Sequence, residues 1–176
     1  MQNPAIITRQ VTLTTMPPVF LRGEHVPVLI RNQDNMFILG TKEMYPEGIA
    51  RLVGGGLDED TPLKGAIREV QEELQIALTP DQLTPLARVA YHISHSEDIV
   101  FTAHLFFASI DQPVHPSDDL DGIIELSELE LEKLIEKYAQ LTSQTLPDLG
   151  FSWKDYGIIF GDLHQIALDK VRQLQL

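Results

Sequence analysis

The chain has 176 residues, of which 43% are hydrophobic, and this is enough apolar material for one globular domain covering residues 1–176. It carries 13 Lys and Arg against 26 Asp and Glu, which gives a net charge of −13. Since nucleic-acid binding depends on cations that neutralise phosphates, this charge argues against a nucleic-acid partner. No apolar run reaches the roughly 18 residues of a membrane span, so we expect no membrane contact. The absence of Cys excludes disulfides and thiolate chemistry and suits a cytoplasmic location.

Short apolar or β-branched segments, separated by turn residues, indicate strands. The candidate strands are 6–13, 26–30, 36–39, 49–53, 86–93 and 99–110. The polar turn at 32–35 makes 36–39 a hairpin partner of the strand before it. Residues 111–122 are predicted to form an acidic loop with two prolines.

Three helices complete the prediction, and the first follows three consecutive glycines at 54–56. Asp60 or Thr61 can cap it, and Pro62 suits its first turn. Its apolar positions recur at helical spacing: Leu63, Ala66, Ile67, Val70 and Leu74. The other two helices are expected at 127–140 and 153–174. This order of elements predicts an α+β fold in which helices cover both faces of a mixed β-sheet, an α/β/α sandwich.

Three acids of the first helix carry the chemical signal. Glu69, Glu72 and Glu73 are spaced so that their carboxylates crowd one surface spot, which we place opposite the apolar stripe. Like charges at this spacing destabilise a helix by a few tenths of a kcal/mol. A solvated acidic face explains most Glu runs, so this alternative stays open for the acids taken alone. Arg68 and the glycines just before the helix shift the interpretation towards a ligand site.

Taken together, residues 54–76 resemble the Nudix box, G-x5-E-x7-R-E-U-x-E-E-x-G-U, where U is a bulky apolar residue. The Arg68-Glu69-Val70-Gln71-Glu72-Glu73 core matches it fully. Asp60 replaces the first Glu, which keeps the charge on a shorter side chain. Gln75 replaces the late Gly, so the turn after the helix is expected to be made differently.

The resemblance implies a Nudix-like α/β/α sandwich and the hydrolysis of a nucleoside diphosphate linked to another group, with Mg²⁺ or Mn²⁺ as cofactor. Oxygen ligands suit these hard cations, which neutralise charge at the phosphates. The implied metal ligands are Glu72 and Glu73, joined by Glu69 or by the backbone carbonyl of Gly54. The implied catalytic residues are Arg68, Glu69 and Glu72; Glu69 could instead help to activate water, and Arg68 would orient its neighbours, pairing with Asp60.

Members of this family often add one more acid from a loop outside the box. The loop before the second helix offers Asp118, Asp119, Asp121 and Glu125, of which we favour Asp119 and Asp121. Glu97 and Asp98, in the turn between two strands, are a second option. An acidic solvated turn is an equally good interpretation of the loop residues.

The resemblance therefore predicts an enzyme that acts on a small nucleotide, such as a nucleotide sugar or a dinucleoside polyphosphate. The alternative is a non-catalytic module that senses a nucleotide. A homodimer is left open, because many family members dimerise. Trp153 and Tyr156 could stack on a base, but we favour a role in anchoring the last helix to the core.

Overall fold

The computed structural model describes residues 4–117, 119–143 and 150–176. In this part of the chain the strands form one seven-stranded sheet in the order β1-β5-β6-β3-β4-β7, with β2 paired to β6. The strands are β1 (Ala5–Thr12), β2 (Glu24–His25), β3 (Val28–Arg31), β4 (Phe37–Thr41), β5 (Leu83–Ser94), β6 (Asp98–Ser109) and β7 (Gly122–Leu126). Parallel pairs such as β1–β5 and β3–β6 occur beside antiparallel pairs such as β5–β6 and β4–β7, so the sheet is mixed, as predicted.

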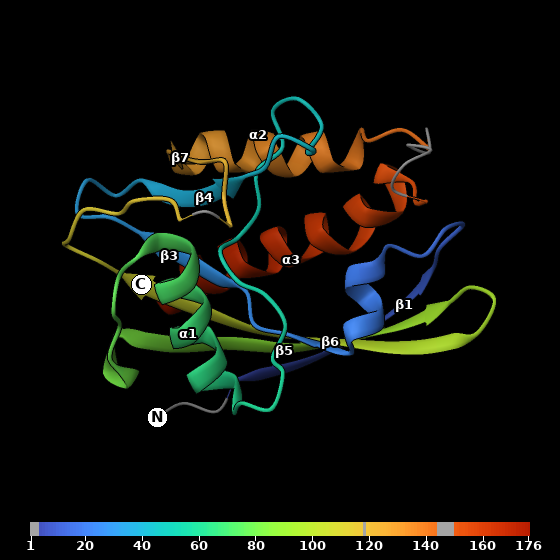
Figure 1. The fold of residues 1–176 in the computed structure, drawn as a ribbon, viewed down its shortest axis with the longest axis horizontal. Helices are drawn as coiled ribbons and strands as arrows, with labels where there is room; N and C mark the ends of the chain where they lie inside the picture. Colours follow the sequence, from blue (N-terminus) through green and yellow to red (C-terminus); the bar gives the residue numbers. More distant parts are fainter. Residues whose placement is uncertain (1–3, 118, 144–149) are drawn as a thin grey trace.

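The helices lie on both faces of this sheet (Figure 1). They are α1 (Pro62–Leu74), α2 (Glu128–Ala139) and α3 (Trp153–Leu174), with short 3-10 helices η1 (Pro18–Arg22) and η2 (Pro80–Gln82). One hydrophobic cluster joins the sheet to α1, and a second joins it to α2 and α3. The expected α/β/α sandwich is therefore confirmed. Within the described ranges, we find no helix of the length and apolarity that crossing a membrane requires.

Because side chains alternate between the two faces, a single strand contributes residues to both clusters. In β3, Val28 and Ile30 belong to the cluster under α1, whereas Leu29 belongs to the cluster under α3. Successive side chains of a strand point to opposite faces, so a central strand covered on both faces must be apolar at every position. All three side chains are fully buried. The buried side chains on this face of the sheet therefore hold α1, and the polar side chains that it carries, in position.

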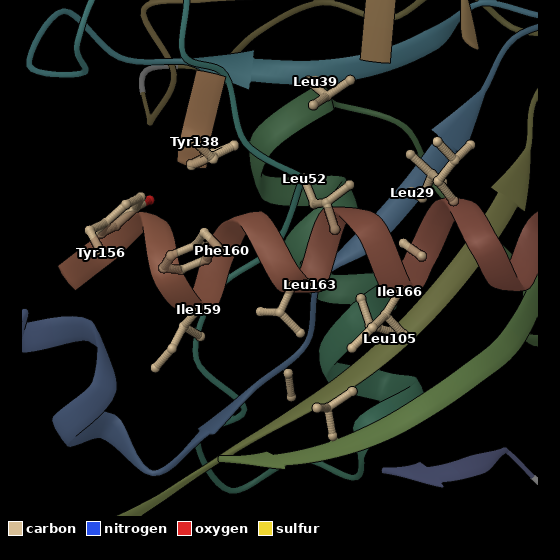
Figure 2. Packing of buried hydrophobic residues seen from close by; sticks show 14 of the residues in the cluster. Leu29, Leu39, Leu52, Leu105, Tyr138, Tyr156, Ile159, Phe160, Leu163 and Ile166 are labelled. Carbon is tan, nitrogen blue, oxygen red and sulfur yellow. The ribbon is translucent and has the colours of Figure 1, made fainter. Parts of the chain in front are cut away.

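The long helix α3 lies across the other face, with Phe160, Leu163 and Ile166 along it and Leu52 beside it (Figure 2). These side chains are at most 5% exposed. Full burial of an apolar side chain of this size contributes about 1.5–3 kcal/mol. The first turns of α3 are thereby held in place against the segment that leads into the glycines.

The predicted strand at 49–53 is not a strand. The segment makes only isolated bridges, one between Arg51 and Gly40 and one between Val53 and Val28. Strands β3 and β4 are paired only next to their turn, at Ile30–Ile38 and the adjacent pair. Farther from the turn the two strands diverge, and the segment lies between them, with one bridge to each. A chain that bonds to two different strands in turn cannot build a continuous ladder.

The sequence analysis also missed β7, since 111–122 was assigned to a loop and the next element was a helix at 127. Residues Gly122–Leu126 instead pair antiparallel with β4 and form an edge of the sheet. The helix that follows begins with a capping box, in which Ser127 and Glu130 exchange hydrogen bonds. A five-residue edge strand with one acid inside carries too weak a pattern to be separated from loop residues by periodicity alone.

A buried histidine joins α3 to the segment at 49–53. The Nε2 atom of His164 accepts the backbone N–H of Leu52 at 3.2 Å, and Nδ1 lies 2.6 Å from the carbonyl oxygen of Phe160. These partners assign the neutral tautomer with its proton on Nδ1. Burial lowers the pKa of His164 from 6.5 to about 4.

We predict that the protein loses stability in mild acid. Between pH 6.5 and about 4, His164 is protonated in the unfolded chain but neutral in the folded chain, so the unfolded state binds more protons and the free energy of unfolding falls as the pH falls. The loss from this residue is of order 3 kcal/mol. Urea denaturation of the wild type and of His164→Gln across this interval measures it: the variant should show the shallower pH dependence. His92→Gln, at an exposed position, should behave as the wild type. Equal slopes for wild type and His164→Gln would contradict the assignment.

Candidate active site

The glycines at 54–56 pack directly against the acidic helix. The backbone N–H of Gly54 donates to Glu73 Oε2 at 2.8 Å. A Cβ atom at Gly55 would lie 2.2 Å from Glu69 Oε2, so any other residue there would push the Glu69 carboxylate out of its place. We call residues 54–56 the glycine loop. Two consecutive backbone positions of this loop are therefore in contact with two carboxylates of α1.

The three acids do not share one solvated face. Glu69 is 8% exposed and Glu73 is 5% exposed, whereas Glu72 is exposed. The expectation that all three lie opposite the apolar stripe is thus wrong for Glu69 and Glu73. Glu73 follows Ala66 by seven residues, almost two helical turns, and so stands beside the stripe. The glycine loop covers this edge of the helix and buries both carboxylates.

Arg68 links the acids to the loop. Its Nε donates to Asp60 Oδ2 at 3.0 Å, which is the pairing expected from the sequence. Its Nη1 donates to Glu69 Oε1 at 2.7 Å and to Glu72 Oε2 at 3.0 Å. Its Nη2 donates to the carbonyl oxygen of Gly56 at 2.9 Å. One rigid guanidinium group therefore fixes the loop, the start of α1 and two of its carboxylates relative to one another.

The ends of α1 also differ from the prediction. Thr61 is the N-cap residue but makes no side-chain capping bond, and the carboxylate of Asp60 is used by Arg68 instead. At the other end, Gln75 itself adopts the left-handed conformation, with φ 59°, that a late Gly would provide. Its side-chain amide donates to the carbonyl oxygen of Pro116 at 3.1 Å. The turn is thus made in the usual conformation, with a tie to the following loop.

Burial changes the proton affinity of the two enclosed acids. Burial raises the pKa of Glu69 above the usual range of a carboxyl group, and hydrogen bonding and charge attraction from Arg68 oppose this rise. Burial likewise raises the pKa of Glu73, opposed by Arg51 and by the N–H of Gly54. Perturbed carboxyl groups of this kind gather at functional sites more often than elsewhere.

Gly54 occupies a position that only glycine fits. Its φ is +140°, and a Cβ atom would lie 2.2 Å from the carbonyl oxygen of Val26. Its own carbonyl oxygen accepts a hydrogen bond from Arg51 Nη2 at 3.0 Å, and the same nitrogen is 3.8 Å from Glu73 Oε1. Arg51 therefore supports the loop at Gly54, whereas Arg68 holds it at Gly56. The role of the Gly54 carbonyl as a metal ligand stays a prediction.

A pocket of about 390 Å³ opens on the other side of Gly55. Three cationic side chains line it, those of Arg22, Lys42 and Arg51. Gly55 lines it as well, so the residue that touches the Glu69 carboxylate is also a wall of the pocket. Gly55 is thus a residue that the pocket and the acidic helix have in common.

Aromatic side chains form much of the remaining wall. Tyr45, Trp153 and Tyr156 line the pocket, and Trp153 lies 5.1 Å from Tyr156 between ring centroids. Trp153 and Tyr156 are also 6% and 4% exposed and belong to the cluster under α3, and Tyr156 stacks on Phe160 at 4.3 Å. They anchor the helix, as favoured from the sequence, and at the same time present ring surface to the pocket.

The loop that was expected to supply a further acid runs past the end of α1. Asp118 lies outside the described residues. Asp119 is exposed, and the carboxylate of Asp121 accepts the backbone N–H of Glu43, so Asp121 ties β7 to the segment after β4. Their part in the site stays a prediction.

The other candidate acids are placed elsewhere. Glu125, on β7, accepts a hydrogen bond from the side chain of Asn32 at 2.9 Å. Glu97 and Asp98 belong to the tip of the β5–β6 hairpin, which lies at the far right in Figure 1, away from α1. The structure therefore does not bring these three acids to the glycine loop.

The carboxylates of α1 suit a hard divalent cation. Glu69 and Glu72 each accept a hydrogen bond from the same nitrogen of Arg68, so one oxygen of each faces that guanidinium group. Within the described ranges, no three acidic or histidine side chains are grouped closely enough to enclose an ion by themselves. Mg²⁺ does not need such a cage, because proteins commonly hold it by one or two carboxylates while water and substrate phosphates fill its other positions. The carboxylate oxygens of α1 are thus of the type that Mg²⁺ prefers, and a metal site at these acids stays a prediction.

Comparison with known proteins decides the family. The model of the NUDIX domain matches residues 21–149, which include the glycine loop and α1. The chain belongs to the NUDIX family. This match confirms the family and the enzyme class that were predicted from the sequence. No curated protein matches the chain in sequence.

Solved structures share the fold of this NUDIX domain at low sequence identity. The MutT protein of Methanosarcina mazei is 19% identical over 100% of both chains, with a TM-score of 0.51. An Ap4A hydrolase of C. elegans is 16% identical over 86% of this chain and 96% of its own, with a TM-score of 0.53. The dihydroneopterin triphosphate pyrophosphohydrolase of E. coli is 17% identical over 90% of this chain and 96% of its own, also with a TM-score of 0.53. At these identities the similarity shows the fold alone.

The pocket of this NUDIX domain was missed from the sequence. Arg22, Lys42 and Arg51 come from η1, from the segment after β4 and from the segment before the glycines. No local motif joins them. The one available signal was that few of the chain's residues are cations, and that four of these, including the three of the pocket, fall within residues 22–53, just before the glycines.

We predict that the Arg68 network stabilises this NUDIX domain measurably. Lysine at position 68 keeps the charge but cannot reach all the partners of a guanidinium group, so Arg68→Lys should lower the free energy of unfolding by about 1–3 kcal/mol. Arg172→Lys is the matched control, because Arg172 is 40% exposed and pairs only at the surface with Glu128 and Glu132. Its loss should stay below about 1 kcal/mol. Denaturant unfolding of the wild type and both variants measures these losses. Equal losses of unfolding free energy would show that the network contributes no more than a surface ion pair.

Proposed function

We propose that this protein is a divalent-cation-dependent pyrophosphohydrolase that cleaves the diphosphate bond of a nucleoside diphosphate linked to another group. The observation that carries the proposal is the position of Gly55, which lies against the Glu69 carboxylate and also lines the cationic pocket. A diphosphate drawn to the cations would lie next to the carboxylates. Membership of the NUDIX family supports the same reaction.

The three acids of α1 and Arg68 each have a part in this proposal. Glu69, Glu72 and Glu73, with the carbonyl of Gly54, would hold Mg²⁺ or Mn²⁺. When bound, such an ion neutralises phosphate charge and makes water a better nucleophile. Arg68 orients Glu69 and Glu72 through its shared hydrogen bonds. Glu73 holds the glycine loop in place through the N–H of Gly54.

Two further assignments belong to the proposal. Glu69 is also the candidate for taking a proton from the attacking water, because it is the acid next to the pocket wall. Asp119 and Asp121 remain candidates for an additional acid from the loop beyond α1. Their side chains would have to approach α1 when a substrate binds.

The substrate is a small nucleotide in this proposal. The net charge of −13 disfavours nucleic acid, whereas three cations in one pocket favour a compact anion. Solved proteins of the same fold are named for Ap4A and for dihydroneopterin triphosphate, both of which contain phosphoanhydride bonds. A chain without cysteine fits a cytoplasmic location, and a homodimer remains a hypothesis.

Hydrolysis of nucleotides with and without a divalent ion tests the proposal. Purified protein should release phosphate-containing products from at least one member of a panel of nucleotide sugars, dinucleoside polyphosphates and nucleoside triphosphates when Mg²⁺ or Mn²⁺ is present. EDTA should abolish the release. Binding of a nucleotide without any turnover across the panel would favour a nucleotide-sensing module instead.

We predict that Glu73→Gln lowers turnover by roughly a hundredfold or more while the fold persists, because the amide oxygen still accepts the N–H of Gly54 but carries no charge for a cation. Glu59→Gln is the matched control, since Glu59 is exposed on the loop before the helix. It should keep wild-type turnover. Near-normal activity of Glu73→Gln would remove Glu73 from the set of metal ligands.

The glycine loop gives a second prediction. In Gly55→Ala the new methyl group must displace the Glu69 carboxylate, and a shift of about 1 Å in a catalytic group can cost about a hundredfold in rate. In Gly56→Ala the nearest atom to the new Cβ is 3.5 Å away, so this variant should retain most of its activity. Steady-state rates of the two variants provide the comparison. Similar rates would show that the close approach at Gly55 has no role in turnover.

A further inference from the structure

His25 is a buried side chain whose polar atoms have no partner in the described part of the chain. It is 1% exposed, and neither Nδ1 nor Nε2 makes a hydrogen bond there. His164 is equally buried but uses both of its ring nitrogens. Because a buried polar group without a hydrogen bond lowers stability, nearly all such groups in proteins are paired. The nitrogens of His25 are therefore free to bind a partner other than the protein.

His25 belongs to the wall of the cationic pocket beside the glycine loop. Its backbone pairs with Ala103 of β6 and forms a bridge to Gly56. Its ring packs near the rings of Phe101 and Phe160, each 6.0 Å away between centroids. These contacts fix the side chain at the pocket. A partner for its nitrogens would thus be a molecule that enters this pocket.

The hydroxyl group of Tyr156 repeats this pattern in the same pocket. Tyr156 is 4% exposed and lines the pocket as well. Burial raises the pKa of its hydroxyl, and Arg51 and Tyr45 are near enough to affect it, but neither is placed to form a hydrogen bond with good geometry. Four buried side-chain atoms lack a hydrogen-bond partner among the described residues, and three of them belong to His25 and Tyr156. A few convergent polar groups in an otherwise apolar wall are typical of a ligand site.

The ring of His25 is neutral near pH 7. Burial lowers the pKa of His25 well below 6.5, and repulsion from Arg51 and Arg22 lowers it further. A neutral imidazole has one N–H that donates and one nitrogen that accepts. The pocket therefore offers an uncharged donor and an uncharged acceptor together with its three cations, Arg22, Lys42 and Arg51.

The cations and the histidine suit different parts of a nucleotide. Phosphate oxygens only accept hydrogen bonds, and charged guanidinium and ammonium groups bind them more strongly than a neutral imidazole does. The accepting nitrogen of His25 binds a donor, and the three cations of the pocket disfavour a positively charged one. Sugar hydroxyls and the N–H groups of bases are uncharged donors. The nucleoside is thus the part of a nucleotide that matches His25.

We infer that His25 is a specificity-determining residue that exchanges hydrogen bonds with the nucleoside part of the substrate, at a sugar hydroxyl or at the edge of the base. This inference rests on the proposed function, which supplies the nucleotide. At about 390 Å³ the pocket is within the usual range of small-molecule sites. Aromatic side chains of its wall, such as that of Trp153, can pack against a base or a sugar ring.

Calorimetric titration of the full chain in EDTA tests the inference without turnover. The wild type is titrated with ATP, GTP, CTP and UTP, and the nucleotide that binds most tightly is compared with its 2′,3′-dideoxy form and with tripolyphosphate. His25→Leu removes both nitrogens at a similar side-chain volume. It should weaken the binding of the nucleotide by about fivefold to tenfold and that of tripolyphosphate by less than about twofold.

His92→Leu is the matched control for binding. It makes the same change at an exposed position of β5 and should alter neither affinity. If no nucleotide binds without metal, the same comparison is made with Mg²⁺, on KM for the nucleotides and on the inhibition constant for tripolyphosphate.

The dideoxy nucleotide locates the contact. If His25 binds a sugar hydroxyl, the dideoxy form should bind to the wild type and to His25→Leu with equal affinity. If His25 binds the edge of the base, the dideoxy form should lose as much affinity as the parent nucleotide. Either result supports the inference. An equal loss for tripolyphosphate would overturn it, because His25 would then contact phosphate, and so would the absence of any loss.

Stability separates a ligand contact from a structural role. Since His25 makes no hydrogen bond within the described residues, His25→Leu should leave the urea midpoint of unfolding unchanged or raise it. His164→Leu deprives the N–H of Leu52 of its acceptor and should lower the midpoint. A midpoint of His25→Leu as low as that of His164→Leu would overturn the inference, because the nitrogens of His25 would then have partners within the protein.

The two proposals fail separately. Metal-dependent hydrolysis of a nucleotide that His25→Leu binds with full affinity would contradict the role of His25 alone. A selective loss of nucleotide binding in His25→Leu, without turnover of any nucleotide by the wild type, would contradict the pyrophosphohydrolase alone. Failure of the wild type to bind any of the four nucleotides, with or without Mg²⁺, would contradict both.

Discussion

The contact between the Glu69 carboxylate and the backbone of Gly55 is the constraint on which the rest of the site depends. A carboxylate can come this close to the loop only where no side chain intervenes. The same residue, Gly55, also lines the pocket. Hydrogen bonds from Gly54 to Glu73 and from Arg68 to Gly56 keep the glycine loop in position.

Burying two carboxylates beside the glycine loop lowers the stability of the folded chain. Burial of Glu69 and Glu73 disfavours their charged forms and raises both pKa values. The arginines offset part of this cost, Arg68 on one side of the loop and Arg51 on the other. The apolar side of α1, which is fully buried on the sheet at Ala66 and Val70, contributes the remaining support. Charges arranged at such expense are typical of a site that binds ligands rather than of a solvated helix face.

The same fold leaves the binding pocket free to vary. The three solved proteins compared above are each below 20% identical to this chain, so the fold is shared while most side chains differ. The pocket is built from η1, from the segment after β4 and from the start of α3. Such peripheral segments can change without disturbing the sheet, and in the proposed enzyme they would carry the substrate specificity. In this chain they supply cations and aromatic rings together.

Local patterns in the sequence determined α1, the long strands β5 and β6, and the family, because capping residues, periodicity and the spacing of 54–76 are all properties of neighbouring residues. They also predicted the pairing of Arg68 with Asp60. The irregular path of 49–53, the strand β7 and the burial of Glu69 and Glu73 were decided by tertiary structure, since each depends on a partner far along the chain. The pocket is the clearest case: Arg22 and Trp153 are 131 positions apart, and only the packing of η1 and α3 on one face of the sheet brings them to the same cavity.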